Sequence, residues 1–404
     1  MADNKDKKVL NVPHLRFPEF SGEWEECSIQ DFGEVVTGNT PPTSHAEYYE
    51  NGSYLWASPA DLGINKNITE TKTKLSLSGF KKTRNIPKGS VLVTCIGSTI
   101  GKMGMATETM SSNQQINSIV VNGKSNSDFV YYAICRAFPR YLSEVGVQAV
   151  PILSKSNFEK LPNYTTCREE QDKIGYFLNL LDERIATQNK IIEKLESLIK
   201  GLNDSLYVRY GDDIRTSFAE LGYSYSGLSG KSAGDFGTGK PFITYLNIYS
   251  NNVVNENDYQ YVQIDEGEKQ NVVQYGDVLF TLSSETPEEV GIGSVYLGQD
   301  EVYLNSFCFG VHIVNEELAY PPYISYYVSS TPFRKFIYPF AQGSTRFNLC
   351  KADFEKASIT LPSLDNQKRI HSVLNSITMK INTERAMLEQ YVTQKQHLLR
   401  QMFI

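Results

Sequence analysis

The feature that most constrains this chain is a long amphipathic pattern that occurs twice, in residues 169–207 and again 196 residues later. Its apolar residues recur at alternating steps of three and four, which keeps one apolar seam on the helix face toward a partner helix. A polar residue interrupts both seams at the same place, Gln188 in the first and Glu384 in the second. The predicted seam comprises Leu178, Leu181, Ile185, Gln188, Ile192, Leu195 and Ile199 in the first stretch and Leu374, Ile377, Ile381, Glu384, Leu388 and Tyr391 in the second.

Each stretch lacks proline and predicts a helix of roughly 40 residues, about 60 Å long at about 1.5 Å per residue. Neither helix can bury its seam alone, so each is the simplest partner of the other. Any long amphipathic helix has such a seam, and many pack inside helix bundles. Because the pattern recurs in register, each time after a globular-looking segment, it favours a spacer that holds two domains apart.

The segments before the two helices also repeat. Residues 89–94 match residues 276–281 at an offset of 187, and residues 129–142, interpreted as a helix interrupted at Pro139, match residues 323–336. Since the offset drifts along the chain, we infer a duplicated domain with insertions in its loops. The sequence therefore predicts a mixed α/β (α+β) fold, internally duplicated, with two globular domains separated by long helices. The predicted domains are residues 1–165 and 211–363, and the spacer helices are residues 166–210 and 364–404.

The spacing of the cysteines and the hydropathy of the chain indicate the cellular compartment of the protein. The six cysteines are scattered without a CxxC pair, which favours reduced thiols in a cytoplasm over a disulfide framework or a zinc site. The five histidines show no metal-binding spacing either. No apolar run approaches the roughly 18 residues of a membrane span, and the N-terminus is too polar for a secretory signal. We therefore expect a cytoplasmic protein without a metal or a membrane contact.

Charge is distributed unevenly along the chain, whose net charge is -7. Residues 66–102 carry eight Lys and Arg against the single acid Glu70, a local charge of +7. Such a patch is typical of a surface that meets phosphate. Residues 208–364, in contrast, hold 10 basic and 19 acidic residues.

Two short motifs have the form of enzyme signatures but lack an essential residue. The GKS at residues 230–232 would need a glycine where Tyr225 stands to form a phosphate loop. Residues 320–323 (YPPY) have the form of an amino-methyltransferase tetrapeptide, but tyrosine cannot replace the Asp, Asn or Ser that accepts from the target amine. No catalytic triad, HExxH or paired-carboxylate signature is found, so the sequence predicts no catalytic residue.

Several stretches together resemble the specificity subunit of type I restriction-modification systems. In the first half they are PHLRFPEFSGEWEE (residues 13–26), TGNTPP (37–42), KGSVLVTCIGSTIGK (88–102) and DERIATQNKIIEKLESL (182–198). In the second half they are GKSAGDFGTGKPFITYLNIYSN (230–251), AQGSTRFNL (341–349) and the terminal helix. The resemblance covers essentially the whole chain, including its duplication.

The resemblance implies a role in DNA recognition. Each globular half would be a target-recognition domain that reads one half of a bipartite DNA site, and the helices would form an antiparallel coiled coil that sets the gap. The subunit itself would be non-catalytic and would bind no cofactor. Two modification subunits would bind S-adenosylmethionine and methylate adenine, and two restriction subunits would use ATP and Mg²⁺ to translocate and cleave double-stranded DNA.

Candidate DNA contacts follow from side-chain chemistry, because Arg, Lys, Asn, Gln, Ser and Thr read base edges or bind phosphate. The candidates in the first domain are Asn39, Thr40, Lys81, Lys82, Arg84, Ser98, Lys102 and Gln114. Those in the second are Lys231, Lys240, Thr244, Ser283, Gln342, Ser344, Thr345 and Arg346. The competing interpretation of each is an ordinary solvated lysine or a turn residue.

Two other classes of protein remain as alternatives. A free-standing DNA methyltransferase would need a cofactor loop and an acceptor tetrapeptide, and neither is found. A coiled-coil scaffold without a nucleic-acid role would leave the +7 segment unexplained.

Overall fold

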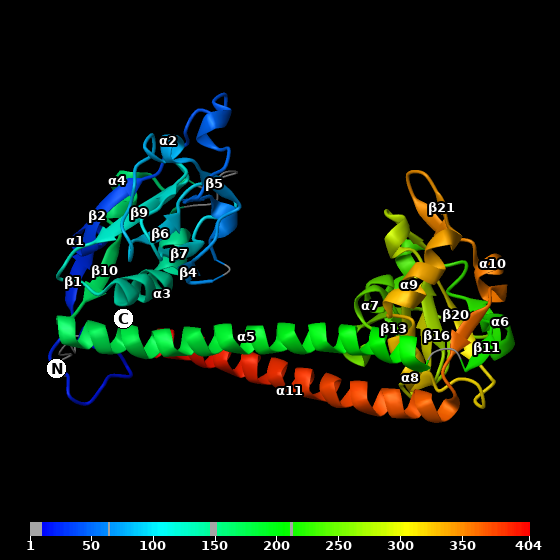
Figure 1. Cartoon of the computed structure of the whole chain (residues 1–404). Coiled ribbons are helices and arrows are strands. Elements are labelled where there is room, and N and C mark those ends of the chain that lie inside the picture. The colour runs from blue at the N-terminus through cyan, green and yellow to red at the C-terminus, as the bar shows by residue number, and fades with distance from the viewer. Residues whose placement is uncertain (1–9, 64, 146–151, 211–212) are drawn as a thin grey trace, which may run out of the picture. The chain divides into compact units, whose positions relative to one another are not determined.

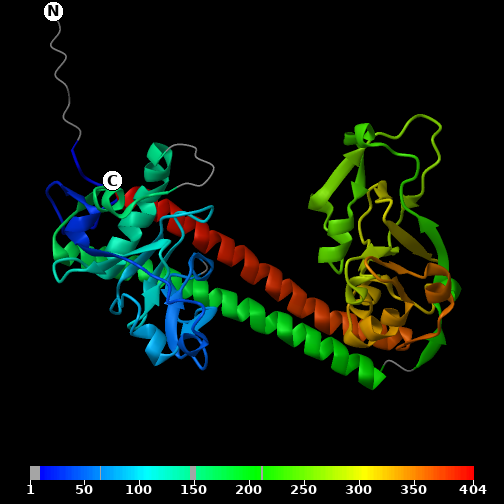
Figure 2. The same cartoon turned by 90° about the horizontal axis from the view of Figure 1, so that it is seen from above.

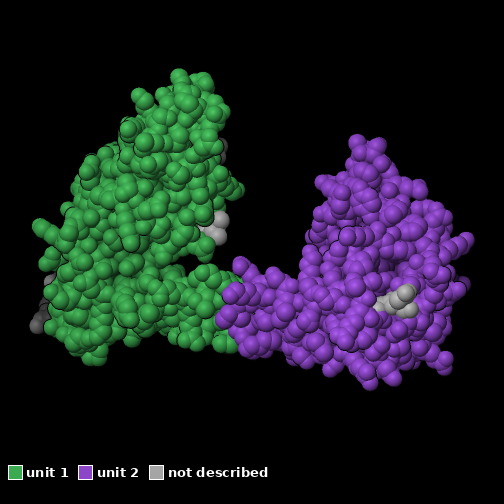
Figure 3. Space-filling view, viewed as in Figure 1, with its two compact units in different colours: residues 1–190, 385–404 green, residues 191–384 purple. Residues whose placement is uncertain are grey.

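The computed structural model describes residues 10–63, 65–145, 152–210 and 213–404. The chain divides into two compact units, unit 1 (residues 1–190 and 385–404) and unit 2 (residues 191–384), coloured separately in Figure 3. Two long helices, α5 (Arg168–Tyr210) and α11 (Leu364–Met402), contribute to both units. The predicted four-part division, which gives each helix a part of its own, stays a prediction.

The charges at the ends of both long helices suit their dipoles. Glu169 and Glu170 lie in the first turn of α5 and Asp365 in the first turn of α11, while Arg209 and Arg400 lie in the last turns. Acidic side chains stabilise the N-terminus of a helix and basic ones its C-terminus. No helix in the described part of the chain is both long and apolar enough to cross a membrane.

The two long helices lie side by side within unit 1 (Figures 1 and 2). Lys395 Nζ of α11 donates to Asp182 Oδ1 of α5 at 2.5 Å, and the Arg184 guanidinium stands 4.9 Å from the centre of the Tyr391 ring. Residue numbers therefore rise along α5 where they fall along α11, so the pair is antiparallel. Leu178 of α5 shares the hydrophobic core of unit 1 with α11.

Unit 1 is built on a five-stranded sheet of mostly antiparallel order β2-β9-β6-β7-β4. These strands are β2 (Gly33–Thr37), β9 (Ile116–Val121), β6 (Val91–Thr94), β7 (Met103–Ala106) and β4 (Asn67–Ile68). A smaller sheet orders β5 (Thr73–Leu75), β3 (Tyr54–Ala57) and β8 (Ser111–Ser112), and β1 (Glu25–Ser28) pairs with β10 (Pro162–Thr165). The helices are α1 (Ile29–Phe32), α2 (Leu77–Phe80), α3 (Ser127–Val145) and α4 (Lys155–Glu159). The main core forms where α3 packs against β6 and β7.

Unit 2 repeats this plan with a sheet of order β12-β20-β16-β18. These strands are β12 (Gly222–Ser226), β20 (Cys308–Ile313), β16 (Val278–Thr281) and β18 (Gly293–Val295). A second sheet orders β14 (Tyr259–Val262), β13 (Phe236–Ile243), β19 (Val302–Leu304) and β15 (Val272–Val273), and β11 (Ile214–Thr216) pairs with β23 (Ile359–Leu361). The third orders β17 (Ser283–Ser284), β22 (Phe347–Leu349) and β21 (Ala341–Gly343). The helices are α6 (Phe218–Leu221), α7 (Tyr245–Ser250), α8 (Pro321–Tyr327), α9 (Thr331–Ile337) and α10 (Lys351–Lys356).

The duplication extends to the pairing register of the central strands. Gly33 opens β2 opposite Val121, and Gly222 opens β12 opposite Ile313. A Cβ on either glycine would come within about 2.1 Å of a carbonyl oxygen of the neighbouring strand, that of Val120 or His312. Both positions therefore need glycine for the same close approach of backbones.

One predicted helix boundary was wrong. The structure continues α3 through Pro139 to Val145, although proline was expected to interrupt it. Pro139 is exposed, while Phe138 and Tyr141 on either side are buried in the core of unit 1. Their packing offsets the one helical hydrogen bond that proline removes.

The predicted counterpart at residues 323–336 is also not one helix. It is split into α8 and α9, because the Ser330 hydroxyl accepts from the backbone N–H of Phe333 and starts a new helix with Pro332 in its first turn.

Candidate nucleic-acid interface

The turn at residues 37–42 gathers several of the contacts predicted in unit 1. Asn39 Nδ2 donates to the carbonyl of Lys82 at 2.9 Å, and Asn39 Oδ1 accepts from the backbone N–H of Arg84 at 2.8 Å. Thr40 Oγ1 donates to Gln114 Oε1 at 2.5 Å. The half-buried Asn39 therefore holds the loop of residues 81–84 against the turn, with both polar atoms of its side chain already hydrogen-bonded.

The other predicted residues of unit 1 are exposed in two further loops. Lys81 and Lys82 follow α2, and Ser98 and Lys102 lie in the loop between β6 and β7. The Arg84 guanidinium is exposed and donates to the carbonyl of Thr37 at 2.8 Å. These loops present positive charge and hydroxyl groups to solvent, which suits contact with a phosphate backbone.

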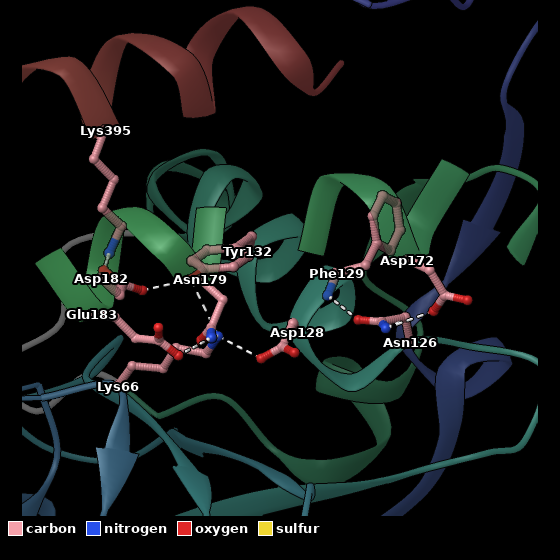
Figure 4. Close-up of polar contacts among 10 residues, drawn as sticks. All are labelled: Lys66, Asn126, Asp128, Phe129, Tyr132, Asp172, Asn179, Asp182, Glu183 and Lys395. Carbon is pink, nitrogen blue, oxygen red and sulfur yellow. Dashed lines mark hydrogen bonds and ion pairs between the residues drawn. The ribbon is translucent and has the colours of Figure 1, made fainter. Parts of the chain in front are cut away.

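Lys66 does not belong to this exposed patch, although the sequence counted it there. Its side chain is only 4% exposed. Its ammonium donates to Asp128 Oδ1 at 2.5 Å, to Asn179 Oδ1 at 2.9 Å and to Tyr132 Oη at 3.1 Å (Figure 4). Because α3 carries Asp128 and Tyr132 and α5 carries Asn179, Lys66 joins the recognition fold to the long helix. A buried ammonium held by three oxygens is a structural group and is closed to DNA.

Tyr132 continues this network between α3 and the long helices. Its hydroxyl donates to Asp182 Oδ2 at 2.5 Å, and Asp182 in turn accepts from Lys395 (Figure 4). Burial, together with the Asp182 carboxylate, raises the pKa of Tyr132 far above its ordinary value, so the phenol stays a donor. Unit 2 repeats the contact, because Tyr326 of α8 and Thr378 of α11 share a hydrogen bond of 2.8 Å. Each unit therefore ties its recognition fold to a long helix through a tyrosine hydroxyl.

Four of the predicted residues of unit 2 lie on the β21–β22 hairpin, which projects from the unit in Figure 1. Gln342, Ser344, Thr345 and Arg346 are all exposed there. The hairpin turns tightly at Gly343, which has φ +145° and whose Cβ would come within 2.1 Å of the Arg346 carbonyl. Glycine is required at this position, and it fixes the place of Arg346 at the end of the turn.

The remaining predictions in unit 2 fall on residues with structural contacts. Lys231 is half-buried and donates to Glu268 Oε2 at 2.5 Å. Hydrogen bonds from Gln270 and Lys231 lower the pKa of Glu268 to about 2. Lys240 is exposed and pairs with Glu301 at 3.3 Å. The Glu268 carboxylate therefore neutralises the Lys231 ammonium. The glycine-rich sequence around Lys231 gave no sign of this ion pair.

Thr244 and Ser283 shape the same region without being exposed. Thr244 begins α7, where its hydroxyl accepts from the backbone N–H of Asn247. Ser283 is buried in β17, opposite Asn348 of β22, and its carbonyl accepts from the Tyr245 hydroxyl at 2.7 Å. These contacts place α7 beside the hairpin that carries Arg346.

A cavity of about 300 Å³ lies at this junction and contains residues that the sequence did not single out. Its lining comprises Tyr245, Leu246, Tyr249, Ser283, Ser284, Glu285, Glu289 and Arg346. Only Ser283 and Arg346 of these were predicted as contacts, because carboxylates such as Glu285 and Glu289 are not among the side chains expected to bind phosphate.

The thirteen predicted seam residues are all buried or half-buried. Leu178, Leu374 and Gln188 are among the buried ones, as is Glu384. The structure also leaves apolar side chains exposed on the outer faces of the long helices. These are Tyr176, Leu180, Ile191, Leu198 and Val208 on α5 and Val373, Met379 and Val392 on α11.

Comparison with known proteins identifies the class to which this fold and these surfaces belong. The family model described as the type I restriction modification DNA specificity domain matches residues 21–197 and 230–391. Because the match covers more than half of the chain and includes both halves, the chain belongs to this family.

Individual relatives agree with this assignment. The chain is 28% identical over 186 residues to the type I restriction enzyme HindI specificity subunit of Haemophilus influenzae, a match that covers 44% of this chain. It is 31% identical over 188 residues, 43% of this chain, to the MjaIX specificity subunit of Methanocaldococcus jannaschii. These matches span 40% and 42% of the relatives' own lengths. The crystal structure of a type I restriction-modification S subunit from M. genitalium shares the fold, with a TM-score of 0.57, 15% identity and coverage of 97% of this chain and 99% of that one.

Proposed function

We propose that this chain is the sequence-specific DNA-recognition subunit of a type I restriction-modification complex. Each recognition fold reads one half of a bipartite site in double-stranded DNA, and the paired long helices set the gap between the halves. The subunit works in the cytoplasm and is itself non-catalytic. It directs adenine methylation and restriction, which are carried out by two modification subunits and two restriction subunits.

The observation that carries this proposal is the repetition of one recognition fold in two compact units. Both units have the same order of central strands, and both present loops rich in Lys, Arg, Gln, Ser and Thr. Two copies of one fold can read two separate short sequences, as a bipartite site requires.

The two units differ in charge, and this difference suits phosphate binding by unit 1 and base reading by a few exposed groups of unit 2. In unit 1 the loops at residues 81–84 and 98–102 expose cations that suit phosphate. The segment of residues 208–364, most of unit 2, is acidic, with 10 basic and 19 acidic residues, and three of its lysines, Lys231, Lys240 and Lys351, are paired with glutamates. Its contribution to DNA binding therefore depends on a few exposed groups such as Arg346 and on phosphate contacts from partner subunits.

Contacts with partner subunits have candidate surfaces on the long helices. Exposed apolar residues such as Tyr176, Leu180 and Val373 lie outside the seam and mark faces suited to other proteins. S-adenosylmethionine, ATP and Mg²⁺ belong to those partners in this proposal. No group of three or more His, Cys, Asp or Glu side chains in the described ranges is arranged to hold a metal ion.

The proposal is tested by co-expressing the chain with its modification subunit in a host without other DNA methylation and mapping methylated adenines across the genome. We expect one bipartite motif with an unread gap, methylated only when both proteins are present. Methylation at an undivided motif, or binding of S-adenosylmethionine by the purified chain alone, would contradict it and favour a free-standing methyltransferase.

A further inference from the structure

The cavity between α7 and the β21–β22 hairpin of unit 2 has a wall that is held rigidly. The Tyr249 hydroxyl donates to Glu289 Oε1 at 2.7 Å, and the Ser284 hydroxyl donates to Glu289 Oε2 at 3.0 Å. These hydrogen bonds lower the pKa of Glu289, so it stays ionised. Tyr245 stacks on Tyr249 with ring centres 6.1 Å apart, and its hydroxyl is fixed by the carbonyl of Ser283.

Two charged side chains at this cavity are not used by the fold. Arg346 and Glu285 are both exposed, and neither makes a side-chain hydrogen bond or ion pair with any residue that the structure describes. They are not paired with each other either, although both line the same cavity. This contrasts with Lys231 and Lys240 of the same unit, which are paired with glutamates. The cavity therefore has one guanidinium group with free N–H donors, that of Arg346, beside one free carboxylate, that of Glu285.

The position of the two residues is better defined than their exposure suggests. Arg346 follows the tight turn at Gly343, and Glu285 directly follows β17, which pairs with β22 in the same small sheet. Both residues therefore lie next to the paired residues Ser284 and Phe347, at the same end of this strand pair.

We propose that Arg346 and Glu285 are specificity-determining residues that together read one G·C base pair in the major groove of the half-site bound by unit 2. This inference rests on the proposed function. Guanine presents its O6 and N7 acceptors to the Arg346 guanidinium, and cytosine presents its N4 amino group to the Glu285 carboxylate. An A·T pair offers a thymine methyl group and only one purine acceptor, so it satisfies the two side chains less well.

The pairing also accounts for a carboxylate at a DNA surface. A glutamate near phosphate is repelled, whereas a glutamate that faces a base edge accepts from an amino group. The charge of the neighbouring arginine reduces the remaining repulsion.

The test uses the full chain reconstituted with its modification subunits, after the wild-type site has been mapped by methylation. Binding is measured on duplexes in which each base pair of both half-sites is replaced in turn. The variants are Arg346→Gln and Glu285→Gln. Matched controls are Lys335→Gln and Glu288→Gln, which make the same changes of charge on exposed side chains of unit 2 outside the cavity lining.

We expect both variants to lower selectivity at the same G·C pair of one half-site, by about five- to 150-fold, while the other half-site and the controls keep wild-type selectivity. Arg346→Gln should in addition favour adenine at that position, because glutamine pairs with adenine N6 and N7.

Equal weakening on all duplexes, effects at two different base pairs, an effect at an A·T pair, or unchanged selectivity would each overturn the inference. A wild-type complex that binds every duplex alike would instead overturn the proposed function itself.

Discussion

Replacing Lys66 by methionine tests whether this lysine is a structural group or a DNA contact. The change keeps the aliphatic stem but removes the ammonium that binds Asp128, Asn179 and Tyr132. Breaking a buried ion pair costs about 3–5 kcal/mol. Because Asp128 is 34% exposed and can be partly rehydrated, we expect about 2–3 kcal/mol here.

The expected loss can be measured as a shift in thermal unfolding of the full chain. Unit 1 falls in the size range of about 150–250 residues, for which a loss of about 1 kcal/mol in the free energy of unfolding lowers Tm by about 2–4 °C. Lys66→Met should therefore lower the Tm of the transition of unit 1 by about 4–12 °C in scanning calorimetry. Lys82→Met is the matched control, because Lys82 is exposed, and its change should stay within about 0.5 kcal/mol.

The Lys66→Met variant should leave the salt dependence of DNA binding unchanged. In the reconstituted complex, the slope of log K against log salt for Lys66→Met should equal that of the wild type. A slope less steep by about 0.9 would mean that Lys66 neutralises a phosphate. That result, or a stability equal to that of the Lys82→Met control, would refute the structural role.

Three further perturbations have defined outcomes. Changing the exposed cations of the loop 81–84 to alanine should make the salt slope less steep by about 0.9 per lost phosphate contact, and an unchanged slope would remove this loop from the interface. Lys231→Met should raise the pKa of Glu268 from about 2 toward its ordinary value in a carboxyl NMR titration, so that the stabilisation by its ionised form is lost at a higher pH as the pH falls. A pKa that stays near 2 would show that Lys231 contributes nothing. Inserting four residues into each long helix, after Lys190 and after Glu384, lengthens each by about 6 Å and should widen the unread gap by about two base pairs in methylation maps. An unchanged gap with activity retained would mean that the helices tether the domains without measuring DNA.

The large-scale organisation could be predicted because it is encoded in repeated local patterns. The three-and-four spacing of apolar residues indicates a long helix wherever it persists without proline, and α5 and α11 follow it. The matching segments 89–94 and 276–281 fall on or beside β6 and β16, which occupy equivalent places in their sheets. Periodicity and repetition are properties of neighbouring residues, so a single sequence displays them.

The burial and the partners of individual polar side chains could not be predicted, because the partners lie far away in the chain. Lys66 appears in the sequence as one of eight cations, yet its partner Asn179 lies 113 positions away. Lys231 lies 37 positions from Glu268. The helix through Pro139 depends likewise on tertiary packing, which outweighs the local propensity of proline. The cavity of unit 2 combines segments around residues 245, 285 and 346, and no spacing rule joins them.

The central claim is that two recognition folds read two halves of one DNA site independently, and one exchange of segments tests it most directly. Residues 215–362 are replaced by the corresponding segment of another specificity subunit, and the chimaera is expressed with the modification subunit. Methylated adenines are then mapped for the chimaera and for the original chain. The account predicts that one half of the motif changes while the other half stays identical. A motif in which both halves change together, or in which neither changes, would contradict it.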